Sequence, residues 1–230
     1  MSTSIDIENF LSTIETEMEK FRVTTLKNVA KKTRDPFRVL IGCIISLRTK
    51  DEVTHEASTR LFNVADSPTK MSNLSEEDIE KLIYPAGFYR NKAKQIKEIA
   101  KQLAEEHNSK VPKSIDQLVS FKGVGRKTAN LVVTLGYNLP GICVDTHVAR
   151  IVHRIGYIEP KKFDEKGLPV FHSPDDVEMK LRKRLPKIWW IPINDLLVTW
   201  GQNICKPISP ICSKCFVFEK CPKVGVIKNR

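Results

Sequence analysis

The chain has 230 residues, 41% hydrophobic and 28% charged, with 38 Lys and Arg against 27 Asp and Glu, a formal net charge of +11. This composition excludes a disordered, collagen-like or low-complexity protein and predicts one large or two small globular domains. The charge-free stretches 39–47 and 129–144 are too short or too interrupted to cross a bilayer, so we expect no membrane association. The first residues lack the basic and apolar regions of a secretory signal. We therefore expect the protein inside the cell, in the cytoplasm or nucleoid if it is prokaryotic.

Helical periodicity runs through almost the whole chain. Apolar residues recur in steps of three and four from Ile7 to Phe21, which predicts one buried stripe on an opening helix. Helix-start patterns follow, each with a capping residue ahead of an apolar run, at Asp35, Ser75, Ser114 and Ser173. Alternating strand patterns are hardly found, so we predict an all-α fold of about ten helices. The stretches 66–72, 159–172 and everything after 205 are expected to be irregular.

The positive charge is concentrated in two segments. Residues 81–130 carry 11 basic and 4 acidic side chains, a balance of +7, and residues 180–230 carry 11 and 2, a balance of +9. A single lysine run is usually a solvated helix face. Two concentrated blocks in a chain of this size instead predict a polyanionic partner, most simply nucleic acid.

Four of the six cysteines lie within seventeen residues near the C-terminus, in the pattern C-x6-C-x2-C-x5-C. They are Cys205, Cys212, Cys215 and Cys221. In a chain expected inside the cell, this cluster predicts a metal centre rather than disulfides. The spacing leaves Zn²⁺ and an iron–sulfur cluster as equal alternatives. Cys43 and Cys143 lie in apolar runs and are expected to be core residues.

A short glycine-containing turn joins a helix predicted at 114–120 to a second helix predicted to end at Gly136. The turn and the start of the second helix contain Gly123, Val124, Gly125, Arg126 and Lys127. Glycine permits a tight turn, and its amides together with those of a helix start form an anion site that suits a phosphate. A plain connection between two helices is the alternative.

Lys127 and Asp145 are the candidates for chemistry. Lys127 falls in the first turn of its helix, where the helix dipole disfavours an ammonium group, and burial would favour the neutral amine further. A neutral lysine is the nucleophile of Schiff-base chemistry, although a phosphate contact beside Arg126 is the alternative. Asp145 is expected to cap a helix, and facing a cavity it would also stabilise positive charge or transfer protons. His147 is a rival base that we expect to serve packing or a structural hydrogen bond.

The order of these motifs resembles endonuclease III, a family of bifunctional DNA glycosylases in the helix-hairpin-helix superfamily. The resemblance runs from about Phe21 to Pro222. It implies a two-lobed fold, with a helical barrel domain at 29–139 and an iron–sulfur cluster domain formed by 1–28 and 140–230. Double-stranded DNA with damaged bases or abasic sites would bind across the cleft between the lobes of a monomer.

The same resemblance implies a [4Fe-4S] cluster, rather than zinc, at the four cysteines. It implies that Lys127 attacks the sugar of an extruded nucleotide, that Asp145 assists, and that an oxidised pyrimidine is lost before the strand breaks by β-elimination. The phosphate contacts would come from the glycine turn with Arg126 and, beside the cluster, from Lys206, Lys214 and Lys220.

The sequence departs from the family pattern three residues before Asp51, where Gln is common and this chain has Arg48. We expect Arg48 to fill the gap left by the extruded nucleotide, with Phe88 wedging from the opposite side. The segment 161–173 also looks longer than usual, and the resemblance gives it no function.

Two alternative functions differ in what they require of the chain. Adenine-mismatch glycosylases carry a catalytic Glu where this sequence has Ile44, and monofunctional thymine-mismatch glycosylases usually carry another residue at position 127. Lys127 together with Ile44 argues against both. A non-catalytic DNA-binding module with a structural metal is the alternative from another class, and the pair of Lys127 and Asp145 disfavours it.

Overall fold

The computed structural model describes residues 5–17 and 35–230. The packing of the chain divides it into two compact units, one formed by Thr25–Gly141 and the other by Met1–Thr24 together with Ile142–Arg230. The described residues are mostly helical, which confirms the predicted all-α fold. In these ranges no helix is long and apolar enough to span a membrane.

The predicted domain boundaries remain a prediction. The first of them, at residue 28, lies outside the described residues, and the second, at residue 139, lies two residues before the end of the unit Thr25–Gly141. Met18 and Phe21, which end the predicted stripe of the opening helix, also lie outside the described residues.

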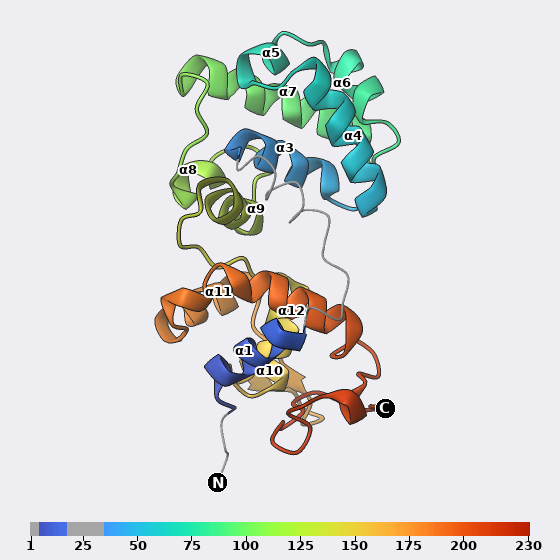
Figure 1. Ribbon diagram of the computed structural model, residues 1–230, viewed down its shortest axis with the longest axis vertical. Helices are drawn as coiled ribbons and strands as arrows, with labels where there is room; N and C mark the ends of the chain where they lie inside the picture. Colours follow the sequence, from blue (N-terminus) through green and yellow to red (C-terminus); the bar gives the residue numbers. More distant parts are fainter. Residues whose placement is uncertain (1–4, 18–34) are drawn as a thin grey trace. The chain divides into compact units, whose positions relative to one another are not determined.

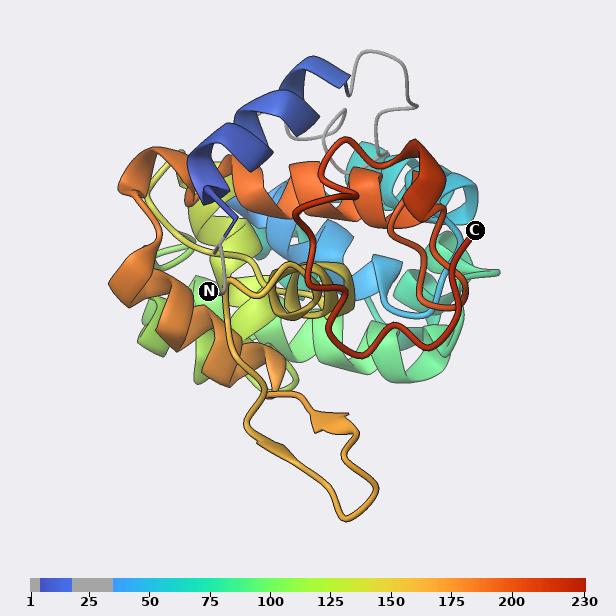
Figure 2. The same ribbon diagram turned by 90° about the horizontal axis from the view of Figure 1, so that it is seen from below.

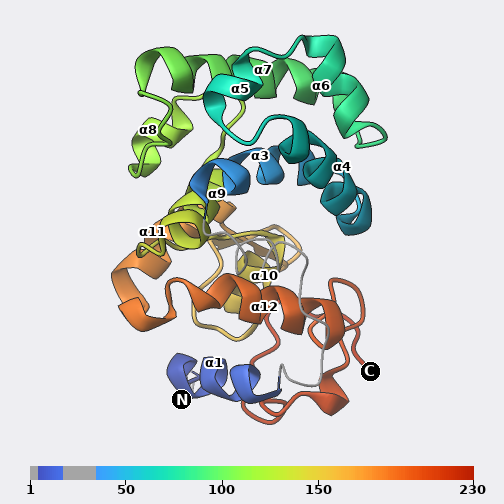
Figure 3. The same cartoon turned by 45° about the horizontal axis from the view of Figure 1, so that its top comes forward.

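The unit Thr25–Gly141 is built around one apolar helix. Its elements are α3 (Pro36–Ser46), α4 (Asp51–Val64), α5 (Pro68–Ser72), α6 (Glu76–Ile83), α7 (Tyr89–Glu106), α8 (Ile115–Val119), α9 (Arg126–Leu131) and the π-helical turn η2 (Val132–Gly136). Helix α3 is apolar on nearly every side, as a helix surrounded by others must be, and it packs against α4, α7, α9 and η2. Figures 1 and 3 show α7 lying along α5 and α6, away from α9.

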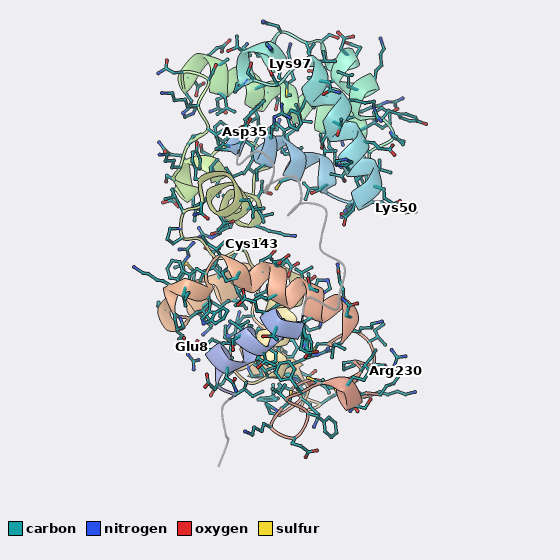
Figure 4. The ribbon with its side chains drawn as sticks, in the orientation of Figure 1. Glu8, Asp35, Lys50, Lys97, Cys143 and Arg230 are labelled. Atoms are coloured by element: carbon teal, nitrogen blue, oxygen red, sulfur yellow. The ribbon has the colours of Figure 1, made fainter. Side chains whose placement is uncertain are left out.

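Capping side chains explain where several helices begin. Asp35, Ser75 and Ser173 each accept a hydrogen bond from an amide in the first turn of the following helix, as predicted. Figure 4 labels Asp35 at the start of α3. Ser114 differs, because it precedes α8 but its side chain makes no capping bond.

The second unit contains both described ends of the chain. Its elements are α1 (Ile7–Glu17), α10 (Thr146–Arg154), β1 (Lys162–Phe163), β2 (Pro169–Val170), α11 (Pro174–Arg184), the 3₁₀ turn η3 (Lys187–Trp189), α12 (Pro192–Asn203) and the 3₁₀ turn η4 (Cys212–Lys214). Helix α12 packs against α10 and α1. The stripe of Ile7, Leu11 and Ile14 is buried in this core, as predicted.

A short β-hairpin stands where the sequence predicts irregular chain. β1 and β2 pair antiparallel, with Lys162 opposite Val170. Asp164 Oδ1 accepts two amides from across the turn, and Gly167 has a φ of +73°, so the turn carries its own support. Figure 2 shows this hairpin extending away from α10 and α11. Strands of two residues carry too little alternation to be read from sequence.

The helix predicted to run unbroken to Gly136 changes character on the way. It is α-helical to Leu131 and π-helical from Val132. At its end, a Cβ on Gly136 would lie 2.7 Å from the Cα of Pro36, so this helix approaches the start of α3 as closely as glycine allows.

Candidate functional site

The turn between α8 and α9 holds its two glycines in different conformations. Gly123 has a φ of +76°, and a Cβ there would lie 2.5 Å from Nε2 of Gln95, so the turn requires glycine. Gly125 has a φ of −88° and open space around the position of a Cβ, so the fold does not require glycine there. Val124 anchors the turn from inside, with a side chain 3% exposed and an amide that donates to the Phe121 carbonyl at 3.0 Å. The contact of Val124 with DNA stays a prediction.

Lys127 lies at the second position of α9 and is exposed. The three residues that follow it in α9 are buried, whereas Arg126 is half-buried. The ammonium group is near enough to α3 to act on Cys43. Burial raises the pKa of the Cys43 thiol to about 12, and the Lys127 charge acts in the opposite direction.

Arg48 and Phe88 lie together, on the loops that lead into α4 and α7. The guanidinium carbon of Arg48 is 5.5 Å from the centre of the Phe88 ring, and both side chains are exposed. Both backbones are left-handed, with φ of +53° and +57°, which is rare for residues with large side chains. The structure thus brings this predicted pair together within one unit. The loop of Arg48 ends at Lys50, which Figure 4 labels.

Asp145 caps α10. Its Oδ1 accepts the amides of His147 and Val148, both at 2.9 Å, and its side chain is half-buried. Asp145 belongs to the unit that begins at Ile142, whereas Lys127 belongs to the other unit.

His147 makes a structural contact, as expected. Its Nδ1 lies 3.1 Å from Nη2 of Arg150. A Cβ on Gly201 would lie 2.4 Å from that Nδ1, so α12 meets α10 here through a glycine. Nη2 of Arg150 also donates to the Cys205 carbonyl at 2.9 Å.

The four predicted cysteine ligands line one pocket. They are Cys205, Cys212, Cys215 and Cys221. The pocket also contains the apolar side chains of Phe10 in α1, Ile151 in α10 and Ile155 directly after α10. Burial raises the pKa of the Cys215 thiol to about 11 and also raises the pKa values of the Cys212 and Cys221 thiols. A metal that binds here must therefore displace protons.

Arg154 of α10 fixes the cysteine loop and is a site residue that the sequence motifs do not identify. Its side chain is 6% exposed, and its guanidinium donates to the Lys206 carbonyl at 2.6 Å, the Pro207 carbonyl at 2.7 Å and the Cys205 sulfur at 3.5 Å. Its own carbonyl lies 3.6 Å from the Cys221 sulfur. The sequence pattern that indicates such a residue is an arginine on the apolar side of an amphipathic helix, because a buried arginine needs partners.

The three predicted lysines of the cysteine loop differ in exposure. Lys214 and Lys220 are exposed, and Lys206 is half-buried. Within the described ranges, no three His, Cys, Asp or Glu side chains are grouped closely enough to hold a single metal ion.

Comparisons with known proteins place the chain in a family. Residues 41–187 match the HhH-GPD superfamily of base excision DNA repair proteins. Endonuclease III of Thermotoga maritima is 42% identical over 204 residues, covering 86% of this chain and 91% of that protein. A solved structure of a trapped endonuclease III–DNA covalent intermediate matches with a TM-score of 0.80 and 30% identity, covering 97% of both chains. A thermostable thymine-DNA glycosylase matches with a TM-score of 0.77, covering 94% of this chain and 95% of its own, and at 23% identity it shows the fold alone. The chain therefore belongs to the endonuclease III family of the HhH-GPD superfamily.

Proposed function

We infer that this chain is a bifunctional DNA glycosylase and abasic-site lyase of base excision repair, with Lys127 as its nucleophile. The observation that carries this conclusion is the placement of Lys127, an exposed amine at the start of α9 directly after a turn that requires glycine at Gly123. The solved covalent intermediate of a related endonuclease III with DNA supports a covalent mechanism.

The proposed chemistry proceeds in steps that this chain's own residues can serve. A damaged nucleotide is extruded from the stack, because its sugar cannot be reached inside the duplex. Nζ of Lys127, after losing a proton, attacks C1′, and the base departs with the electrons of the glycosidic bond. The C1′–O4′ bond then breaks, its electrons and a proton going to the ring oxygen, and the lone pair of Nζ forms the second bond of an iminium between Lys127 and the opened sugar. Loss of the C2′ proton then expels the 3′ phosphate by β-elimination.

Asp145 is the residue we assign to proton transfer. Nζ of Lys127 has to lose a proton before it attacks C1′, and a base has to accept that proton. Both capping bonds of Asp145 go to Oδ1, so Oδ2 is the oxygen we assign to accept that proton. The same carboxylate would stabilise positive charge on the sugar.

The glycine turn and the basic loop are the DNA contacts that we propose. The amides of a helix's first turn have no partner inside the helix, and α9 begins at a glycine that brings no capping side chain. Exposed Lys214 and Lys220 would contact phosphates near the cysteines. The test is the salt dependence of binding, because each neutralised phosphate steepens the fall of log affinity with log salt by about 0.9 for duplex DNA.

A [4Fe-4S] cluster is the group that we assign to the four cysteines. The resemblance to endonuclease III favours this cluster over a single Zn²⁺ ion, the alternative that the cysteine spacing leaves open. Four thiols around one largely apolar pocket fit a larger inorganic cluster. When bound, the cluster would cross-link the loop and hold its lysines in place. Stoichiometric iron and a brown protein are expected; a colourless, zinc-loaded and fully active preparation would remove this assignment.

Oxidised pyrimidines in double-stranded DNA are the substrates we propose, acted on by a monomer inside the cell. A mismatch-specific glycosylase is the competing assignment. The adenine-specific form is disfavoured because position 44 is an isoleucine only 1% exposed in the core of α3, not an acid. Rates on a panel of oxidised pyrimidines and of mismatched thymine and adenine will separate the remaining choices.

Borohydride trapping on DNA with an abasic site or an oxidised pyrimidine tests the nucleophile. We expect wild type to form a covalent complex and Lys127→Gln to lose it while still binding DNA. Lys122→Gln is the matched control, because Lys122 is an exposed lysine of the same turn that pairs with Glu98 at 3.7 Å, and it should trap normally. A wild type that binds these substrates but never crosslinks would show the lyase assignment to be wrong.

A further inference from the structure

Lys92 is a buried lysine to which the proposed mechanism gives no part. It lies in the first turn of α7, is 5% exposed, and donates from Nζ to the Ile45 carbonyl at 2.6 Å, the Leu47 carbonyl at 2.6 Å and Thr49 Oγ1 at 2.8 Å. All three N–H donors of its ammonium group are thus used. Its acceptors lie at the C-terminal end of α3, where carbonyls lack helical partners and the helix dipole favours a cation.

Thr49 extends this network to the loop before α7. Its Oγ1 accepts the amide of Gly87 at 3.0 Å as well as the Lys92 ammonium, and donates to the Leu47 carbonyl at 3.3 Å. A Cβ on Gly87 would lie 2.5 Å from the carbonyl oxygen of Arg48, so the two loops meet at the closest possible distance. One hydroxyl therefore joins the loop that precedes α4 to the loop that precedes α7.

The network encloses the two exposed residues in left-handed conformation. Arg48 stands between Leu47 and Thr49, both bonded to Lys92, and Phe88 follows Gly87, which is bonded to Thr49. The carbonyl of Phe88 also accepts the backbone amide of Lys92 at 3.1 Å. Large side chains persist in this backbone region only where neighbouring groups hold them, and such positions gather at functional sites.

We propose that Lys92 and Thr49 are positioning residues that hold Arg48 and Phe88 as a rigid pair for insertion into duplex DNA opened by nucleotide extrusion. This proposal rests on the proposed function, because only a nucleotide extruded from a duplex leaves a gap to fill. Lys92 and Thr49 touch no reacting atom. Their effect is therefore expected on duplex DNA and not on single-stranded DNA, which has no opposite strand to support.

The test compares abasic-site cleavage on duplex and single-stranded DNA, measured as kcat/KM for each. Thr49→Val keeps the shape of the side chain and removes the hydroxyl, whereas Thr49→Ser keeps the hydroxyl. We expect Thr49→Val to lower kcat/KM about tenfold on duplex DNA, equivalent to ~1.4 kcal/mol, and to leave the single-stranded reaction unchanged. Thr49→Ser should recover the duplex activity, and Lys92→Met should show the same selective loss as Thr49→Val.

Two further variants separate positioning from a general loss of structure. Thr59→Val is the matched control, because Thr59 is exposed on α4 and its hydroxyl bonds only the His55 carbonyl one turn earlier, at 2.8 Å. It should react like wild type on both substrates. In a protein already carrying Arg48→Ala and Phe88→Ala, adding Thr49→Val should cause no further loss, because the pair it positions is gone.

The outcomes distinguish this inference from the function on which it rests. A Thr49→Val protein that matches wild type on duplex DNA, or that loses both activities equally, would overturn the positioning role while leaving the lyase assignment intact. A wild type inactive on both substrates would overturn the proposed function itself, and the positioning role with it.

Discussion

The cysteine loop should depend on Arg154 for stability, and Arg154→Met tests this directly. Methionine keeps much of the buried apolar stem but removes the guanidinium. The change deletes a weak contact to the Cys205 sulfur and two charge-assisted hydrogen bonds, to the Lys206 and Pro207 carbonyls, each of the two ordinarily worth about 1.5–3 kcal/mol. Pro207 is exposed and Lys206 half-buried, so water can reach both carbonyls once the guanidinium is gone. The loss should therefore lie at the lower end, at about 3 kcal/mol.

The expected loss is large enough to measure by thermal unfolding. For a chain of this length, 1 kcal/mol shifts Tm by about 2–4 °C, so Arg154→Met should melt about 6–12 °C below wild type. The matched control is Arg184→Met in the same unit, where an exposed guanidinium lies 5.1 Å from the centre of the Tyr157 ring. Such a contact is worth about 0.5–1 kcal/mol, or about 1–4 °C. If Arg154→Met melts no lower than Arg184→Met and binds as much iron as wild type, Arg154 does not hold the loop.

Three shorter tests concern other parts of the structure. Burial lowers the pKa of His153, so the native state favours the neutral ring. The free energy of unfolding should therefore fall as the pH drops below about 6.5, the pKa of an unfolded histidine. In thermal melts between pH 7.5 and 5, Tm should decline more steeply for wild type than for His153→Phe. Gly123→Ala should lower the free energy of unfolding by about 1–2 kcal/mol because φ at this position is positive, whereas Gly125→Ala should lower it by less than about 0.5 kcal/mol. Denaturant titrations that give the reverse order would contradict the turn geometry. Burial raises the pKa of the Cys43 thiol to about 12, so iodoacetamide at pH 8 should leave it unmodified in the native protein, and its rapid labelling in peptide maps would show that this part of the core opens.

Features set by neighbouring residues were predictable from the sequence. Asp145 caps its helix because a carboxylate at that position reaches the next amides whatever surrounds it. The cysteine pattern predicts one pocket because short spacings confine four thiols to one loop. Cys43 and Cys143 are buried, as their apolar surroundings indicate.

Features set by packing between distant segments were not predictable. Lys127 is exposed, and which side of α9 faces inward depends on how it packs against α3. Arg154 finds its partners more than fifty residues further along the chain, so no local pattern links them. The roles of Lys92 and Thr49 likewise appear only once α7 lies beside the end of α3.

The positions of the lysine side chains change what the formal net charge of +11 says about DNA binding. Residues 81–130 carry a net charge of +7. Of their lysines, Lys92 donates to carbonyls at the end of α3. Lys97, labelled in Figure 4, donates to the Ser72 and Leu74 carbonyls at and after the end of α5. Both lysines stabilise helix ends by the same means, and neither is free to meet a phosphate. Charge counted along a sequence therefore overstates the charge offered to DNA. We therefore expect this segment to contribute fewer phosphate contacts, as counted from the salt dependence of binding, than it has basic residues.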